Sequence, residues 1–158
     1  MENIGFVKQV YSKCFNLARD LHQGQKYGDS DYFTGHICKV IDKVWSISTF
    51  ISTEDKYILQ CVAALHDSLE DCCGEDSLQG HLIPQRIIDA VKKLTKEEGE
   101  SLEDYISKVN SCDTARLVKI ADALCNLEES LKSGEERRIN KYLKTLELLD
   151  TSKEKVDD

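Results

Sequence analysis

The stretch CVAALHDSLEDCCG, residues 61–74, combines an apolar helical pattern with four ionisable side chains, His66, Asp67, Glu70 and Asp71. On a helix, residues three or four positions apart share a face, so these groups form one acidic cluster that includes an imidazole. Burial of such groups is unfavourable unless they are paired or hold a metal ion. A divalent cation favours ionised carboxylates and a neutral imidazole, and the cluster therefore predicts a metal site.

Two ligands from one helix do not complete a metal site, and two more residues in apolar surroundings are candidates. His36 follows a glycine-containing loop and opens a predicted helix. Asp122 lies inside LVKIADALCNL, where apolar residues flank it on both sides. If both side chains follow the core faces of their helices, they point towards the helix that carries His66 and Asp67.

The elements that must position these residues are predicted to be helices. Pro84 is the single proline, and β-branched residues do not alternate along the chain, so strand signals are weak. Four helices are predicted over about residues 3–22, 36–49, 84–94 and 135–149. Another begins near residue 53 and contains CVAALHDSLED, and two more begin at residues 101 and 113. Ser52 or Thr53, Ser101 and Asp113 are predicted to begin three of them. HQGQKYGDSDYFTG and CCGEDSLQGHLIP are predicted to be loops.

This order of elements predicts an all-α domain of about six or seven helices. The chain has 158 residues, the size of one domain. Residues 1–150 are assigned to that domain, and TSKEKVDD, residues 151–158, to a charged flexible tail.

Composition excludes several classes of function. The formal charge of −8 argues against binding to nucleic acid, which requires a basic face. The sequence contains no apolar run of about 18 residues, which argues against a membrane span. The seven cysteines are odd in number and include no C-x-x-C pair, so we expect free thiols in a soluble, cytoplasmic protein. Zinc binding by Cys72, Cys73 and His81 is the less favoured alternative.

The order of His36, then His66 with Asp67, then a distant Asp122 resembles the HD phosphohydrolase superfamily. Longer motifs resemble the RelA/SpoT-type alarmone hydrolases in particular. HQGQKYGDSDYFTGH is similar to their HxGQxR…PYxxH, AALHDSLED to AxLLHDxxED, and VKIADALCN to VKLADRLHN, and LTK at 94–96 recurs in the family. The resemblance extends over about residues 14–127, which is most of the chain.

The resemblance implies a compact HD-domain helical bundle that uses Mn²⁺, or another divalent transition metal, to hydrolyse the 3′-pyrophosphate of (p)ppGpp or (p)ppApp. The implied metal ligands are His36, His66, Asp67 and Asp122. Glu70 and Asp71 would orient or deprotonate the attacking water. Asn126 would contact the ribose or a substrate phosphate.

Further substrate contacts are expected from residues that carry charge or an aromatic ring. Lys26, Lys96 and Lys119 can attract an anionic substrate, with surface solvation as the alternative. Tyr27 stands where the family has an Arg that stacks on the purine, and it either stacks or packs beneath the loop. Tyr142, on the last predicted helix, contacts a substrate phosphate if it acts as a Tyr near the carboxyl end does in similar small hydrolases. Otherwise it packs in the core.

The sequence departs from the family pattern at several positions near the proposed site. Tyr27 replaces the Arg, Tyr32 before Phe33 replaces the Pro before Tyr, and Ala123 and Cys125 replace an Arg and a His. These changes spare the proposed metal ligands, so hydrolysis is a firmer expectation than guanine specificity. The purine, the number of 5′-phosphates, the physiological metal and the oligomeric state stay open.

Two other functions compete with alarmone hydrolysis. The first is an HD-type nucleotidase or phosphohydrolase that acts on another nucleotide. The second is a binding module without catalysis, in which any metal only stabilises the fold. The complete ligand set and the intact Glu70 and Asp71 pair argue against the second.

Overall fold

The computed structural model describes residues 3–150, which fold into nine α-helices, one π-helix and one short hairpin. The helices are α1 (Ile4–Leu21), α2 (Cys38–Ile47), α3 (Thr53–Leu65), α4 (Ser68–Asp71), α5 (Glu75–Gly80), α6 (Gln85–Leu94), α7 (Leu102–Asn110), α8 (Asp113–Ser133) and α9 (Glu136–Asp150). The hairpin strands are β1 (Lys26–Tyr27) and β2 (Ser30–Asp31), and the π-helix η1 spans Phe33–Ile37. The predicted tail, 151–158, lies outside the described residues.

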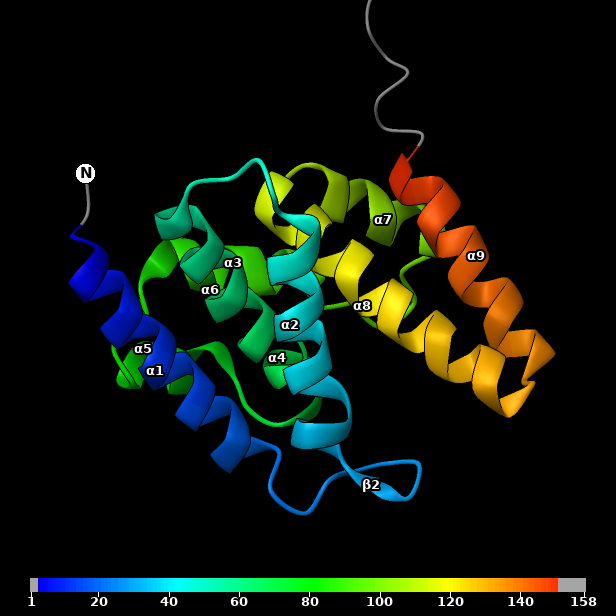
Figure 1. Cartoon of the computed structure of the whole chain (residues 1–158), viewed down its shortest axis with the longest axis horizontal. Helices are drawn as coiled ribbons and strands as arrows, with labels where there is room; N and C mark the ends of the chain where they lie inside the picture. Colours follow the sequence, from blue (N-terminus) through cyan, green and yellow to red (C-terminus); the bar gives the residue numbers. More distant parts are fainter. Residues whose placement is uncertain (1–2, 151–158) are drawn as a thin grey trace, which may run out of the picture.

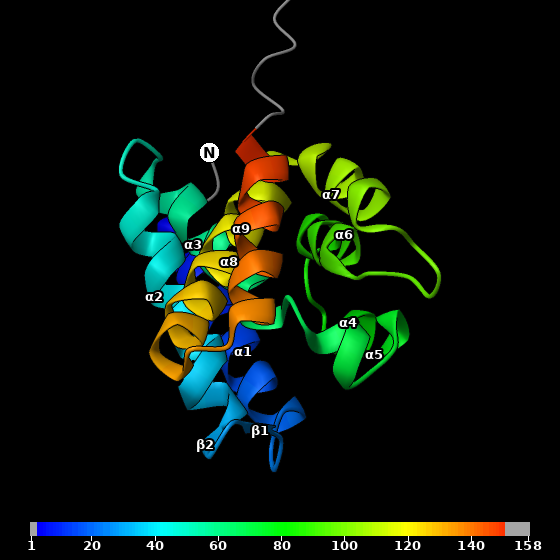
Figure 2. The ribbon, with the colours of Figure 1, turned by 90° about the vertical axis from the view of Figure 1, so that its right-hand side faces the viewer.

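Helix α3 forms the centre of the bundle, as its continuous apolar pattern predicts. All of its residues from Leu59 to Leu65 are buried. It packs against α1, α2, α6 and α8, and α8 in turn packs against α2, α6, α7 and α9 (Figures 1 and 2). The two helices that carry the HD pair and Asp122 therefore lie against each other in the interior, and the expected all-α bundle is confirmed.

Side-chain caps fix the starts of two helices at the predicted residues. Ser52 Oγ accepts a hydrogen bond from the Asp55 amide at 3.1 Å, and Ser101 Oγ accepts one from the Asp104 amide at 3.0 Å. The prediction that Asp113 caps α8 is wrong by one residue. Cys112 occupies the cap position, and Asp113 lies in the first turn, where its negative charge suits the helix dipole.

The number of helices exceeds the predicted six or seven because two segments differ from expectation. The predicted third helix is interrupted at His66 and Asp67, between α3 and α4. Helix α5 forms within CCGEDSLQGHLIP, which was expected to be a loop. It is short, and its buried Leu78 anchors it to the core, so local propensity alone did not indicate it.

A hairpin and the start of a π-helix form within HQGQKYGDSDYFTG, the first predicted loop. Lys26 pairs with Asp31, and Tyr27 with Ser30, across a turn in which Gly28 adopts a φ of 59°. Asp31 Oδ2 then accepts hydrogen bonds from the Thr34 amide and hydroxyl at 3.0 and 3.2 Å, at the start of η1. The hairpin therefore leads directly into the element that carries His36.

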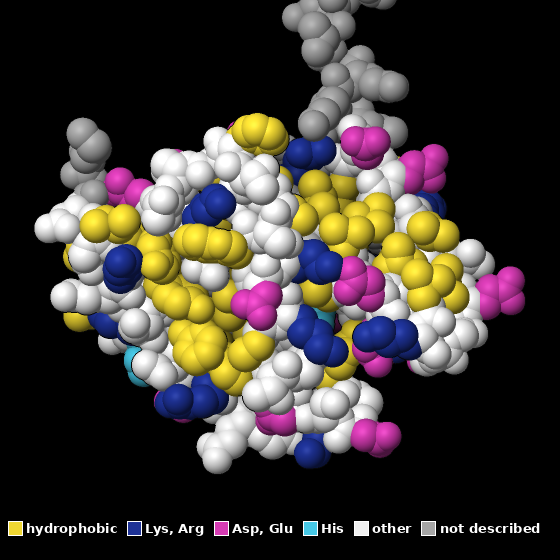
Figure 3. Space-filling view, viewed as in Figure 1, with side chains coloured by type: hydrophobic (Ala, Val, Ile, Leu, Met, Phe, Trp, Pro, Cys, Tyr) yellow, Lys and Arg dark blue, Asp and Glu magenta, His cyan; other side chains and the backbone are white. Residues whose placement is uncertain are grey.

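The surface carries charges of both signs between apolar areas (Figure 3). Trp45 and Leu143 are among the exposed apolar side chains. The seven cysteines are free thiols, as expected. Among residues 3–150, no helix is both long enough and apolar enough to cross a membrane.

Candidate active site

Three separate segments bring the predicted metal ligands together. Nε2 of His36, in η1, lies 3.1 Å from Oδ1 of Asp122, in α8. Nε2 of His66, at the end of α3, lies 3.0 Å from Oδ2 of Asp67 and 3.7 Å from Oδ1 of Asp122. Ligand atoms of His36, His66 and Asp67 all lie within 4.8 Å of one another. The cluster has the donor set of a divalent transition-metal site, two imidazoles and two carboxylates.

The interruption between α3 and α4 allows two consecutive residues to face the same point. On a regular helix, neighbouring side chains point about 100° apart. Asp67 has φ and ψ of −100° and −1°, which ends the regular geometry of α3 before α4 begins. His66 and Asp67 can therefore both turn towards His36 and Asp122, which the continuous helix expected from the sequence would not allow.

His66 supplies the observation that tests whether a metal fits the cluster. Its Nδ1 lies 2.7 Å from the Ala63 carbonyl oxygen, to which it donates, so that Nε2 faces the other three side chains. This Nε2 is buried, and although it lies 3.0 Å from Asp67 Oδ2, it makes no hydrogen bond of good geometry within the described part of the chain. A buried ring nitrogen without a hydrogen bond, aimed at two carboxylates, fits a cation ligand.

The charges in the cluster also suit a cation. Burial opposes a charge on His66, but the Asp67 and Asp122 carboxylates outweigh it and raise the pKa of His66 well above 6.5. Burial likewise opposes the charge on Asp122, while the Lys119 ammonium and the two imidazoles lower its pKa well below the usual range. The two carboxylates stay ionised and concentrate negative charge, and a divalent ion there would take the place of the proton that this charge favours on His66.

Asp122 is held by two neighbours on its own helix. Lys119 Nζ donates to Oδ2 at 2.8 Å, and Asn126 Nδ2 donates to Oδ1 at 2.7 Å. Both carboxylate oxygens therefore have a hydrogen-bond partner besides the imidazoles. Such outer contacts fix the orientation of a metal ligand.

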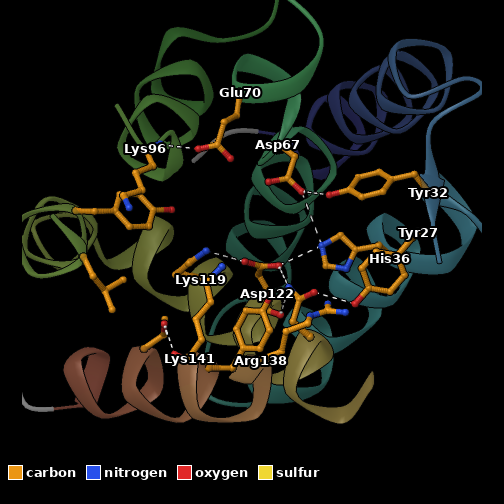
Figure 4. A pocket seen from close by; sticks show the side chains of 15 residues that line it. Tyr27, Tyr32, His36, Asp67, Glu70, Lys96, Lys119, Asp122, Arg138 and Lys141 are labelled. Atoms are coloured by element: carbon orange, nitrogen blue, oxygen red, sulfur yellow. Dashed lines mark hydrogen bonds and ion pairs between the residues drawn. The ribbon is translucent and has the colours of Figure 1, made fainter. Parts of the chain in front are cut away.

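A cavity of about 340 Å³ opens beside this cluster. Figure 4 shows Glu70 and Asp67 on one side, Tyr27, Tyr32 and His36 on another, and residues of α8 and α9 opposite them. Four cationic side chains line it: Lys96, Lys119, Arg138 and Lys141. The cavity thus offers concentrated positive charge next to a candidate metal site, although the chain as a whole carries −8.

The structure separates the two residues expected to act on water. Glu70 lines the cavity, and its Oε1 accepts a hydrogen bond from the Lys96 amide at 2.9 Å. Asp71 does not line the cavity, and its Oδ2 accepts from Gln25 Nε2 at 3.0 Å. Gln25 Oε1 in turn lies 2.7 Å from Nδ1 of the buried His22. Their joint action on one water therefore does not follow from this geometry, since consecutive residues of a short helix diverge.

The predicted substrate contacts are only partly brought together. Lys96, Lys119, Tyr27, Asn126 and Tyr142 all line the cavity. Lys26 does not line it, but borders a neighbouring hollow beside the hairpin.

The ring of Tyr27 stacks on His36, with centroids 4.9 Å apart, and its hydroxyl donates to Asn126 Oδ1 at 2.8 Å. Purine stacking is therefore less favoured for Tyr27 than the sequence suggests, because His36 already occupies one face of the ring.

Six cavity residues were not predicted from the sequence, and three of them, Tyr32, Arg138 and Lys141, add a hydrogen bond or a charge to the site. Tyr32 donates a hydrogen bond from its hydroxyl to Asp67 Oδ2. Burial, together with the Asp67 charge, raises the pKa of Tyr32 well above its usual value, so it remains a donor. Arg138 and Lys141 project from α9 beside Tyr142. A sequence signal existed for these two, because Arg138, Lys141, Tyr142 and Thr145 recur at helical spacing and share one face.

Comparison with known proteins supports the fold. No family model matches the chain, and no curated protein matches it by sequence. Its structure is similar to a solved structure described with a metazoan ortholog of SpoT that hydrolyzes ppGpp and plays a role in starvation responses. The TM-score is 0.69 at 23% sequence identity, and the match covers 89% of this chain and 85% of the other. The chain therefore shares the compact helical-bundle fold of that structure.

Proposed function

We propose that the protein is a metal-dependent hydrolase that removes the 3′-pyrophosphate of a purine alarmone such as (p)ppGpp or (p)ppApp. The observation that carries the proposal is the position of the His36, His66, Asp67 and Asp122 cluster, at a cavity lined by four cations. The structural neighbour, which is described as hydrolysing ppGpp, has the same fold. We further propose Mn²⁺ as the metal and the cytoplasm as the location.

His36, His66, Asp67 and Asp122 would hold the metal. A divalent ion supplies a nucleophile by lowering the pKa of bound water, and it neutralises charge on phosphoryl oxygens. The protein prepares for this by fixing Asp122 through Lys119 and Asn126, and by directing His66 Nε2 through its Nδ1 bond to Ala63. The ligands are thus oriented before substrate binds.

Glu70 is the proposed base for the attacking water. It lies on the cavity wall, and burial raises its pKa above the usual 4.5, although the Lys96 amide opposes the shift. A carboxylate with a raised pKa accepts a proton more readily than an ordinary one. Asp71 does not line the cavity, and it accepts a hydrogen bond from Gln25 instead.

The four cations of the cavity favour a substrate with several phosphates. Lys119 keeps its charge even though it is largely buried, because the Asp122 carboxylate raises its pKa more than burial lowers it. Arg138 offers a planar fork that matches phosphate oxygens, and Lys96 and Lys141 offer ammonium groups. An alarmone carries phosphates on two sides of its ribose, and a nucleoside monophosphate has fewer groups to use these cations.

The proposal is tested by incubating purified protein with Mn²⁺ and ppGpp, pppGpp, ppApp, GMP or AMP, with products separated by chromatography. We expect pyrophosphate and a nucleoside 5′-phosphate product from at least one alarmone, and no orthophosphate from the monophosphates. Orthophosphate from GMP or AMP alone would favour the alternative HD-type nucleotidase. Binding of the nucleotides without any product would favour a binding module.

A further inference from the structure

Two tyrosines of the hairpin region contact the candidate metal site where the resembled family carries other residues. Tyr27 stands in place of an Arg, and Tyr32 in place of a Pro. Neither substitution alters a proposed ligand. Their positions in the fold nevertheless bring both rings against His36, with centroid distances of 4.9 Å for Tyr27 and 5.3 Å for Tyr32.

Tyr32 contacts Asp67 directly. Its hydroxyl donates to Oδ2, the same oxygen that lies 3.0 Å from His66 Nε2. The ring is held between two imidazoles, with centroids 5.1 Å from His22 and 5.3 Å from His36. The hydroxyl therefore has little freedom, and it restrains the oxygen of Asp67 that faces the other ligands.

Tyr27 reaches Asp122 through an intermediate residue. Its hydroxyl donates to Asn126 Oδ1 at 2.8 Å, and Asn126 Nδ2 donates to Asp122 Oδ1 at 2.7 Å. That oxygen of Asp122 lies 3.1 Å from His36 Nε2, and the ring of Tyr27 stacks on His36 at an interplanar angle of 22°. Tyr27 thus touches one candidate ligand with its ring and orients a second one through Asn126.

We infer that Tyr27 and Tyr32 are positioning residues that hold His36, Asp67 and Asp122 in their metal-binding arrangement. The inference rests on the proposed function insofar as the cluster is a metal site. It assigns Tyr27 a role other than purine stacking. It also explains how candidate ligands from η1, the α3–α4 junction and α8 are held together, because Tyr27 and Tyr32 contact all three segments.

The test removes each hydroxyl and keeps each ring. Tyr27→Phe and Tyr32→Phe retain the contacts with His36, and Tyr57→Phe is the control, since Tyr57 packs against Tyr11 and Trp45 away from the cavity. Mn²⁺ affinity is measured by calorimetry without nucleotide. Loss of an outer hydrogen bond to a metal ligand typically costs about 10–100-fold in affinity. We expect a loss of that size for Tyr32→Phe, a loss of about tenfold for Tyr27→Phe, and none for Tyr57→Phe.

A second readout distinguishes positioning of the metal from contact with substrate. Saturating Mn²⁺ should restore alarmone turnover in both variants, with KM close to that of the wild type. Mn²⁺ affinities within twofold of the wild type in both variants would overturn the inference. Tight Mn²⁺ binding by the wild type without alarmone cleavage would overturn the proposed function alone. A wild-type protein that binds no Mn²⁺ would overturn both.

Discussion

Nε2 of His36 lies 3.1 Å from Oδ1 of Asp122, although one residue lies in a π-helix near the amino terminus and the other in the long helix α8. The contact joins the hairpin region to the centre of the bundle. It forms because α2, which continues directly from η1, packs against α8. Bundle packing and the candidate site are therefore coupled, and removal of the metal should lower the free energy of unfolding of the whole domain.

Metal binding is expected to stabilise the folded state. A ligand that binds only the native protein adds about 2.7 kcal/mol when its concentration is 100 times its Kd. For a chain of this size, that corresponds to about 5–10 °C in Tm. Chelation of Mn²⁺ should lower Tm by this amount in the wild type, measured by calorimetric melting. Asp122→Asn should show no such shift, and an equal shift in that variant would contradict the ligand assignment.

Glu70→Gln should abolish most turnover and leave metal binding intact. A general base contributes about 10²–10⁴-fold, so we expect a fall in kcat of that order with Mn²⁺ affinity within twofold of the wild type. Asp71→Asn is the matched comparison. Because Asp71 contacts Gln25 outside the cavity, its loss should reduce kcat less. A larger effect from Asp71→Asn would show that the catalytic carboxylate is Asp71.

The pH dependence of turnover should report Glu70. Burial raises its pKa above 4.5, and a base works only in its ionised form, so kcat falls as the pH drops through this raised pKa. The measurement is kcat against pH at saturating Mn²⁺. The residual kcat of Glu70→Gln should not show this fall at low pH. The same fall in kcat at low pH in the variant would show that another group titrates.

Arg138→Gln should weaken substrate binding more than it slows chemistry. Hydrogen bonds to charged groups contribute about 1.5–3 kcal/mol, which corresponds to about a 10–100-fold rise in KM. We expect kcat to change little, because Arg138 reaches the cavity from α9 and is not one of the candidate metal ligands (Figure 4). Lys132→Gln is the control, since that side chain is 72% exposed on α8. Equal KM values for Arg138→Gln and Lys132→Gln would show that Arg138 does not contact the substrate.

Gly35→Ala should displace the hairpin. A Cβ at this position would lie 2.9 Å from Ser30 Cβ, which is closer than two carbons can approach, so β2 must move. Insertion of atoms into a packed site costs about 1–3 kcal/mol of unfolding free energy. Gly80→Ala, where an added Cβ meets nothing within 4 Å, should be nearly neutral. Equal free energies of unfolding for Gly35→Ala and Gly80→Ala, measured by denaturant titration, would show that the hairpin shifts without loss of stability.

Much of the fold was predictable because helix periodicity and caps are local signals, and the candidate metal cluster was indicated by ionisable residues in apolar surroundings. Apolar periodicity located most helices, and Ser52 and Ser101 marked two starts. The break after α3 was missed because Leu65, Leu69 and Cys72 keep a helical spacing across it. The chemistry contained a clue, since the adjacent His66 and Asp67 cannot both face one ion from a regular helix.

The remaining differences arise from tertiary contacts. Strands of two residues are too short to show alternation, so the hairpin that carries Tyr27 has no periodic signal. Arg138 and Lys141 face the cavity only because α9 folds back against α8 after Gly134, which adopts a φ of 71°. The helical spacing of these residues was visible in the sequence, but the surface they would face was not.

The central claim is that His36, His66, Asp67 and Asp122 jointly bind one divalent ion. The most direct measurement is an anomalous difference map from a crystal grown with Mn²⁺. We expect one strong peak within coordination distance of all four side chains. A peak elsewhere, or His36 and Asp122 turned away from the HD pair, would contradict the account.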